Sequence, residues 1–383
     1  MPDAQRAAAP LRIYDTRAGR LVEPDLDEQV RMYVCGITPY DATHLGHAST
    51  FLAYDVLVRA LIDRGHRVRM VRNVTDVDDP LFAKARELGV HYLDLAAAEE
   101  RRFDADMLAL NAIAPDSAPR ASSAISDIRR LIGAVLDAGR AYTSGGAVYF
   151  AAAESPSLGS LSGLDREAML DLAARRGGNI DDPSKRDPLD FVLWQPSAAD
   201  EPAWDSPWGP GRPGWHVECS ALVLRELGET IDIHGGGADL IYPHHECETL
   251  QSEAATGVEF ARYWMHAALI SMNGEKMSKS LGNLVFIDRL RAEWEPVVIR
   301  AGITGHHYRT EWEWDDDLMA RSAERVARWR QAAGGALGDC IDAVRDCLAD
   351  DLDTPGALAA VDEAAVGGQD VTEACALLGL LLD

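Results

Sequence analysis

Two cysteines, a histidine and a glutamate that lie far apart in the sequence are of the types that bind zinc. Cys35 ends an apolar run and Cys219 lies in GWHVECS, whereas His244 and Glu248 both lie in YPHHECE. Thiolates, imidazoles and carboxylates are the protein ligands of four-coordinate zinc. The spacing of four between His244 and Glu248 places both side chains on one face if this segment is helical. The four residues are a candidate zinc site, although their spacing is not that of a zinc finger.

Other interpretations of these residues remain open. Lone cysteines are most often small buried hydrophobic side chains, and His245 and Cys247 are rival ligands in the same segment. If the metal kept one exchangeable position, a substrate thiol could bind there, because a borderline-soft metal prefers sulfur to oxygen. Such a site would separate cysteine from serine, which a hydrogen-bonding pocket does poorly. Trp215, close to Cys219 in the sequence, could pack against a small substrate or simply belong to the core.

Two short motifs contain residues suited to holding phosphates. HLGH at 44–47 lies where a strand pattern gives way to a helical one, and a helix N-terminus offers unpaired N–H groups to an anion. EKMSKS at 275–280 carries Lys276 and Lys279, which could close over a triphosphate and neutralise a leaving pyrophosphate. Each motif has an ordinary alternative: packed histidines for the first and a solvated basic loop for the second. The combination is more specific than either motif.

The elements around these motifs predict a parallel sheet. RMYVCGI (31–37) reads as a buried strand, a helical pattern follows from His44 to Arg64, and 66–75 reads as a second strand. A β-α-β unit implies parallel strands with a right-handed crossover, and ligands bind at the carboxyl ends of such strands. Cys35, His44, His47 and Thr75 should therefore gather at one edge. DIHGGGADL (232–240) adds a glycine-rich turn that lacks the GxGxxG spacing, and its Asp239 could meet a ribose or an ammonium group.

The rest of the chain predicts an insertion and a helical tail. Helical patterns cover 81–112 and 125–138, a hairpin is expected at 141–150, and 151–214 shows little periodicity. Strands are expected again at 230–236 and 263–272. From about 311 the pattern is helical, with breaks at Gly334–Gly335 and Pro355. The predicted divisions are a first half of the core (1–110), an insertion (111–200), a second half with the metal segment and the lysine motif (201–310) and a helical domain (311–383).

Composition narrows the class of protein. The chain has 383 residues, 47% of them hydrophobic, and a net charge of −25. This charge suits a small substrate better than a polyanionic partner. Six cysteines are too few for a disulfide framework, and neither an apolar leader nor a run of about 18 apolar residues is present. We therefore expect a soluble cytoplasmic protein with no membrane partner.

HLGH and KMSKS resemble the two signature motifs of class I aminoacyl-tRNA synthetases. Longer stretches within 28–310 resemble the cysteine-activating branch of that family: VCGITPYDATHLGH, NVTDVDD, KRDPLDFVLW, GRPGWHVECS, HGGGADLIYPHHE and NGEKMSKSLGN. The resemblance implies an α/β fold, with a class I synthetase-like Rossmann core, an insertion and a small C-terminal helical domain. It also implies that L-cysteine and ATP with Mg²⁺ form cysteinyl adenylate while one Zn²⁺ per chain grips the thiol.

This branch contains cysteinyl-tRNA synthetases and the cysteine:glucosaminyl-inositol ligases of mycothiol biosynthesis. GITPYD, Pro80, RRGGNIDDPSKRDPLD (175–190), HYRTEWEWDD (307–316) and the short helical tail resemble the ligases. ECETLQSEAATG (246–257), with Glu248, and His234 resemble the tRNA enzymes instead. We expect a ligase that joins cysteine to the amine of glucosaminyl-inositol, without tRNA and as a monomer; the alternative is a truncated cysteinyl-tRNA synthetase.

The resemblance also assigns roles to individual residues. Catalytic roles fall to His44, His47, Lys276 and Lys279, and the metal ligands would be Cys35, Cys219, His244 and Glu248. Two rivals from other classes are a non-catalytic cysteine or zinc sensor that kept the fold and an unrelated nucleotidyltransferase with an HxGH motif. The substrate-binding positions implied are Cys35, Gly36, Ile37, Thr38, Thr50, Asn73, Val74, Thr75, Trp215, Gly237, Ala238, Asp239 and Ile270.

Overall fold

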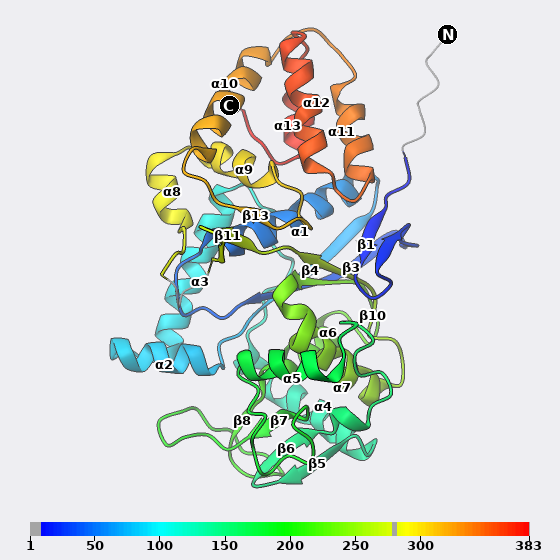
Figure 1. Ribbon diagram of the computed structural model, residues 1–383, viewed down its shortest axis with the longest axis vertical. Coiled ribbons are helices and arrows are strands. Elements are labelled where there is room, and N and C mark those ends of the chain that lie inside the picture. Colours follow the sequence, from blue (N-terminus) through cyan, green and yellow to red (C-terminus); the bar gives the residue numbers. More distant parts are fainter. Residues whose placement is uncertain (1–8, 278–281, 383) are drawn as a thin grey trace.

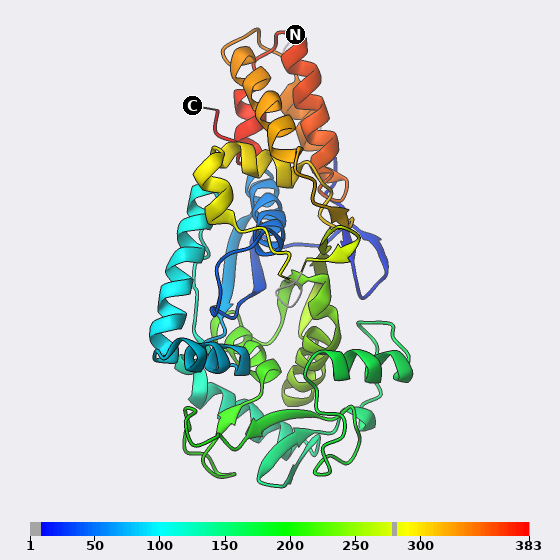
Figure 2. The same ribbon diagram turned by 60° about the vertical axis from the view of Figure 1, so that its left-hand side comes forward.

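A computed structural model describes residues 9–277 and 282–382. The molecule is elongated, with the C-terminal helices at one end, a parallel sheet in the middle and a second sheet at the other end (Figures 1 and 2). The parallel sheet is the part that positions the predicted site residues.

The central sheet has four parallel strands in the order β10-β9-β3-β4. The expected strands at 31–37 and 66–75 are β3 (Gln29–Ile37) and β4 (Arg67–Val74). Those expected from 230 and 263 are β9 (Ile231–Gly237) and β10 (Ala261–Ala267). Most side chains of these strands are buried, as parallel sheets covered by helices require. Because the strands are parallel, their carboxyl ends meet at one edge.

Helix α1 (Leu45–Asp63) connects β3 to β4. It begins after His44, whose side chain accepts a hydrogen bond from the backbone N–H of His47 at 3.3 Å. It ends before Gly65, whose φ of 91° favours glycine. Among the described residues, α1 alone is long and apolar enough to cross a membrane, and 61% of its apolar window is buried inside the protein.

A second sheet, antiparallel in the order β5-β6-β7-β8, follows the first half of the core. The expected helix and hairpin are α4 (Ile125–Asp137), β5 (Ala141–Ser144) and β6 (Ala147–Phe150). The weakly patterned stretch 151–214 nevertheless contains α5 (Arg166–Arg175), β7 (Phe191–Gln195) and β8 (Arg212–Pro213). Helix α5 buries only Met169 and Ala173, so its apolar stripe is too short to be recognised from the sequence.

Two segments predicted as single elements are divided. Residues 81–112 form α2 (Asp79–Leu88) and α3 (Tyr92–Ala109), because Gly89 ends the first helix with a φ of 66°. Residues 263–272 form β10 and β11 (Ile270–Met272). Strand β11 pairs with two further short strands, β12 (Glu275–Lys276) and β13 (Trp312–Glu313). The other connecting elements are β1 (Ile13–Asp15), β2 (Arg20–Val22), η1 (Ala121–Ala124), η2 (Ala152–Glu154), α6 (Trp215–Glu226), η3 (Ala238–Leu240), η4 (Ile241–His245) and α7 (Glu246–Thr256).

The C-terminal region is helical, as predicted. Pro355 does not interrupt a helix but lies in the first turn of the helix that starts at Thr354. A backbone N–H at that position would have no intrahelical acceptor, so proline costs no hydrogen bond there. The helices are α8 (Ile287–Glu293), α9 (Pro296–Thr304), α10 (Leu318–Ala332), α11 (Cys340–Ala349), α12 (Thr354–Val366) and α13 (Thr372–Leu377).

A buried ion pair joins the C-terminal helices to the core. Arg300 on α9 donates to the carboxylate of Asp55 on α1, and the two residues are only 1% and 2% exposed. Arg59 donates to the same carboxylate at 2.8 Å. Burial opposes ionisation of Asp55, but the two guanidinium groups outweigh it and hold its pKa below the ordinary value.

We expect Asp55→Asn to lower the free energy of unfolding by about 3–5 kcal/mol, because it leaves the buried Arg300 without its anionic partner. The folded pKa of Asp55 is lowered, so its contribution is present above the unfolded pKa and is lost as the pH falls through the folded pKa. The difference between wild type and variant should therefore stay nearly constant from pH 7 to about pH 5 and shrink as the pH falls below about 4. Denaturant unfolding measures both effects.

Asp63→Asn is the matched control, since Asp63 lies in the same helix, is more exposed than Asp55 and forms an ion pair with Arg345. It should cost less than about 1 kcal/mol. Equal costs for the two variants at pH 7 would contradict a special role for the buried pair.

Candidate active site

Four ligating side chains from separate segments converge beneath the end of β3. Cys35 comes from β3, Cys219 from α6, His244 from η4 and Glu248 from α7, and none is more than 5% exposed. The sulfur atoms of the two cysteines are 3.9 Å apart. One carboxylate oxygen, Glu248 Oε1, lies 3.4 Å from Cys35 Sγ and 3.1 Å from His244 Nε2. The ligand atoms all lie within 4.8 Å of one another, so the cluster could hold a metal ion.

The electrostatics of this cluster favour the metal-binding forms of two of its residues, Glu248 and Cys219. Burial raises the pKa of Cys35, and, against the effect of burial, Glu248 and Cys219 raise that of His244 to about 10. Burial alone would keep Glu248 protonated, but His234 and His244 lower its pKa to about 2. The hydrogen bond from Cys35 lowers the pKa of Cys219 to about 6, against the effect of burial. A carboxylate and a thiolate are the forms that bind metal ions.

Two aromatic side chains orient His244. Its Nδ1 lies 2.9 Å from Nδ1 of His216, which leaves Nε2 facing the carboxylate and the thiols. Burial, helped by the neighbouring His244, lowers the pKa of His216 to about 3, so His216 is neutral and can accept the Nδ1–H proton of His244. Trp215 packs against the same ring, with the centroids 4.1 Å apart and the ring planes tilted by 33°. A second partner that fixes the tautomer is typical of metal-ligating histidines.

We expect His216→Phe to weaken metal binding by roughly 10–100-fold, because phenylalanine fills the space but cannot accept the Nδ1–H bond. Competition between the protein and a chromophoric chelator for added Zn²⁺ measures the change. His216→Gln keeps an acceptor and should recover part of the affinity. Equal losses in the two variants would show that His216 acts by packing alone.

A second, overlapping donor set was not anticipated. In the described part of the chain, Cys35 and Glu248 also converge with His234 and His245. His245 Nε2 lies 3.3 Å from Cys35 Sγ, and His234 Nε2 lies 3.1 Å from Glu248 Oε2. His245 was ranked below His244 from the sequence, and Cys247, the other rival, belongs to neither set.

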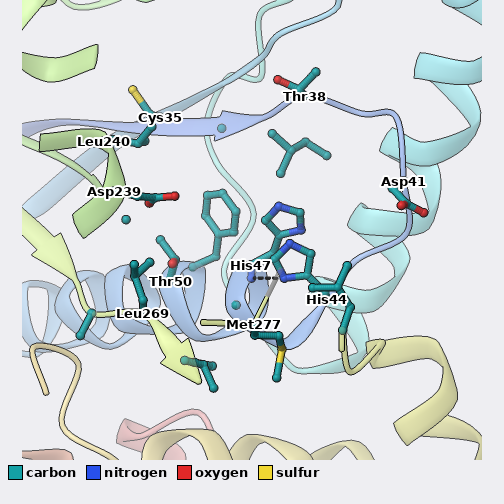
Figure 3. A pocket seen from close by; sticks show the side chains of 18 of the residues that line it. Cys35, Thr38, Asp41, His44, His47, Thr50, Asp239, Leu240, Leu269 and Met277 are labelled. Carbon is teal, nitrogen blue, oxygen red and sulfur yellow. Dashed lines mark hydrogen bonds between the residues drawn. The ribbon is translucent and has the colours of Figure 1, made fainter. Parts of the chain in front are cut away.

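The donor cluster adjoins a cavity of about 340 Å³, shown in Figure 3. Cys35 belongs to both, and Asp239 lies at the same end, while His44 and His47 form another wall (Figure 3). Ten predicted site residues line the cavity: Cys35, Gly36, Ile37, Thr38, His44, His47, Thr50, Gly237, Asp239 and Ile270. Sequence reasoning did not assign a role to nine further lining residues: Tyr40, Asp41, Gly46, Leu240 and Met277, which lie inside the motifs, and Phe51, Ala268, Leu269 and Leu284, which lie outside them.

His44 and His47 lie at the N-terminus of α1, as the sequence predicted. Their rings stack with centroids 3.7 Å apart. Burial and the neighbouring His44 hold the pKa of His47 well below its ordinary value. A neutral imidazole beside the positive end of a helix dipole can donate a hydrogen bond to an anion.

Of the predicted residues that the structure describes, the remaining ones do not line the cavity. Asn73 supports it from behind: its Oδ1 accepts the backbone N–H of Gly36 at 2.7 Å, and its Nδ2 donates to Thr75 at 2.9 Å. A Cβ on Gly36 would lie 1.7 Å from the Asn73 carbonyl oxygen, so only glycine fits there. Val74 ends β4, Ala238 begins η3, and Trp215 contacts His244. Lys279 and the side chain of Lys276 lie outside the described residues.

Comparison with known proteins places the chain in a family. The model of the class I (C) tRNA synthetase catalytic domain matches residues 21–324. Curated relatives named L-cysteine:1D-myo-inositol 2-amino-2-deoxy-alpha-D-glucopyranoside ligase match nearly the whole chain. The Kribbella flavida protein is 46% identical, with 100% of this chain and 96% of the relative covered. The Thermobifida fusca protein is 47% identical, with 98% and 93% covered.

The chain belongs to this ligase family. The fold of the chain is similar to that of solved class I tRNA synthetases. Mycobacterium tuberculosis methionyl-tRNA synthetase in complex with methionyl-adenylate matches with a TM-score of 0.66 and 16% identity, over 90% of this chain and 83% of that one. The predicted α/β class I synthetase-like fold with C-terminal helices is therefore confirmed.

Proposed function

We propose that this chain ligates L-cysteine to the amine of glucosaminyl-inositol through a cysteinyl adenylate intermediate. The names of relatives that are 46–47% identical over nearly their full length support the overall reaction. The observation that carries the mechanism is that Cys35 belongs both to the buried donor cluster and to the wall of the cavity that holds His44 and His47. A thiol-selective site thus adjoins a phosphate-binding one.

The first donor set fits zinc. Tetrahedral zinc with bonds of about 2.3 Å to sulfur separates two thiolates by roughly 3.8 Å, and the two cysteine sulfurs are 3.9 Å apart. We propose Cys35, Cys219, His244 and Glu248 as the ligands of one zinc ion. When bound, zinc supplies a borderline-soft centre that prefers a thiolate to a hydroxyl group. This preference would select cysteine over serine.

The protein's contribution to adenylation is positioning and charge stabilisation. The carboxylate of cysteine attacks the α-phosphorus of ATP, and pyrophosphate leaves. His44 and His47 would hold the phosphates at the N-terminus of α1, and Thr50 and Asp239 would contact the nucleotide side of the cavity. Lys276 and Lys279 are proposed to close over pyrophosphate, and Mg²⁺ is proposed to enter with ATP. In the second step the amine attacks the acyl carbon and AMP leaves.

Cysteine-dependent exchange of pyrophosphate into ATP tests the first step. Amide formation with glucosaminyl-inositol, compared with charging of cysteine tRNA, tests the acceptor. We expect the amino sugar to be preferred, because the net charge of −25 opposes tRNA binding. We also expect the enzyme to act as a monomer.

Glu248, close to His244 at 3.1 Å, favours the alternative of a truncated cysteinyl-tRNA synthetase, since this glutamate is the feature that resembles the tRNA enzymes. Faster turnover with tRNA would overturn the ligase assignment. Absence of exchange would favour a non-catalytic sensor that kept the fold.

A further inference from the structure

Thr38 lines the cavity together with Cys35 and His44, where an adenylate bound between those two residues would present its acyl group. It follows Cys35 by three residues and precedes His44 by six, and all three line the cavity. A cysteinyl adenylate with its thiol beside Cys35 and its phosphate beside His44 places its acyl carbon between these ends. Figure 3 shows Thr38 on the same wall as Cys35, across the cavity from the two histidines.

The hydroxyl group of Thr38 is tied to a carboxylate behind the wall. Thr38 Oγ1 donates to Asp78 Oδ2 at 3.1 Å. Asp78 Oδ1 accepts the backbone N–H of Asp79 at 2.9 Å, because Asp78 is the N-cap of α2. The carboxylate is thus fixed by the helix start, with one oxygen directed at Thr38. Because the hydroxyl hydrogen of Thr38 is donated to Asp78, the lone pairs of Thr38 Oγ1 can accept a proton from the side of the cavity.

We propose that Thr38 and Asp78 form a relay that removes the proton of the attacking amine. This inference rests on the proposed amide-forming function. As the C–N bond forms and the acyl–phosphate C–O bond breaks, the amine N–H proton passes to Thr38 Oγ1 while the Thr38 proton passes to Asp78. The products are the amide, AMP and a protonated Asp78. Thr38 touches the reacting group, and Asp78 acts through it as a positioning residue.

The surroundings of Asp78 suit this role at neutral pH. Burial, aided by the neighbouring Asp79, raises its pKa to about 6, against the hydrogen bond from Thr38 and the guanidinium of Arg212. The other ionisable groups facing it are Glu218 on α6, which interacts with it electrostatically, and Tyr40 in the wall of the cavity. A base is most effective when its pKa lies near the working pH.

Asp78→Asn tests the relay, because asparagine keeps the helix cap but cannot take the proton. We expect amide formation to slow by roughly 100-fold, with cysteine-dependent pyrophosphate exchange at the wild-type rate. In wild type the transfer rate should fall as the pH drops below about 6, the pKa of Asp78, and the variant should lose this limb. Thr38→Ser should retain transfer, whereas Thr38→Val should lose it.

Asp79→Asn, next in the chain, is the matched control: it should keep the transfer rate at neutral pH and an acidic limb, with the limb moved to lower pH because the charge of Asp79 helps to raise the pKa of Asp78. Hydroxylamine serves as a second amine nucleophile, so the relay is tested even if glucosaminyl-inositol is not the acceptor. Lack of product with the amino sugar in wild type would refute only the acceptor. Three results would overturn the relay. Asp78→Asn could keep the wild-type pH profile, it could lose exchange and transfer equally, or the acidic limb of the transfer rate could be lost in Asp41→Asn instead.

Discussion

Cys219→Ala is expected to lose its bound zinc and to lower cysteine-dependent pyrophosphate exchange by more than about 100-fold. Loss of a residue that only hydrogen-bonds to a metal ligand already lowers metal affinity or activity by roughly 10–100-fold. Cys219 is proposed as a direct ligand, so its loss should cost more. Its sulfur lies 3.9 Å from that of Cys35, and it is 1% exposed. Metal analysis of the purified variant and exchange kinetics measure the two effects. Excess Zn²⁺ should restore little of the rate.

Cys247→Ala is the matched control for this prediction. Cys247 is also a buried cysteine, 5% exposed, and is adjacent to Glu248 in the sequence, but it belongs to neither donor set. The variant should keep one zinc per chain and near wild-type exchange, apart from a modest loss of stability. Loss of metal in Cys247→Ala with retention in Cys219→Ala would mean that the donor set has been assigned wrongly.

The part of the site that could be predicted depends on local patterns. The apolar run before Cys35 and the helical period after His44 indicated β3 and α1, and parallel pairing then brought the strand ends together. The spacing of four between His244 and Glu248 likewise produced a contact of 3.1 Å, although His244 lies in η4, just before α7, rather than within that helix.

What could not be predicted depends on packing between distant segments. His216 is the second residue of α6, and no motif marks it as the partner of His244. The contact between Thr38 and Asp78 joins residues 40 positions apart, and it exists only because β3 and β4 are neighbours. The boundary between α2 and α3 at Gly89 was also not predicted, because the helical pattern continues on both sides of it.

The second large effect is expected at the phosphate-binding end of the cavity. His47→Asn should lower the rate of pyrophosphate exchange by roughly 10²–10³-fold, the usual cost of removing one donor to a developing negative charge. The fall should appear in kcat, with the KM for ATP nearly unchanged, if the imidazole acts mainly in the transition state. Because the pKa of His47 is held well below its ordinary value, His47 should add no inflection to the wild-type pH profile near neutrality.

Two comparisons make this prediction specific to the N-terminus of α1. His66→Asn changes a partly exposed histidine just beyond the other end of the same helix, where its Nδ1 contacts the Asp27 carbonyl. This variant should leave exchange unchanged. His47→Asn should also keep its zinc, unlike Cys219→Ala, because His47 belongs to neither donor set. Separate losses, of charge stabilisation in one variant and of metal in the other, would establish two cooperating sites in one cavity. Loss of zinc in His47→Asn would instead indicate a general disruption of the β3–α1 connection.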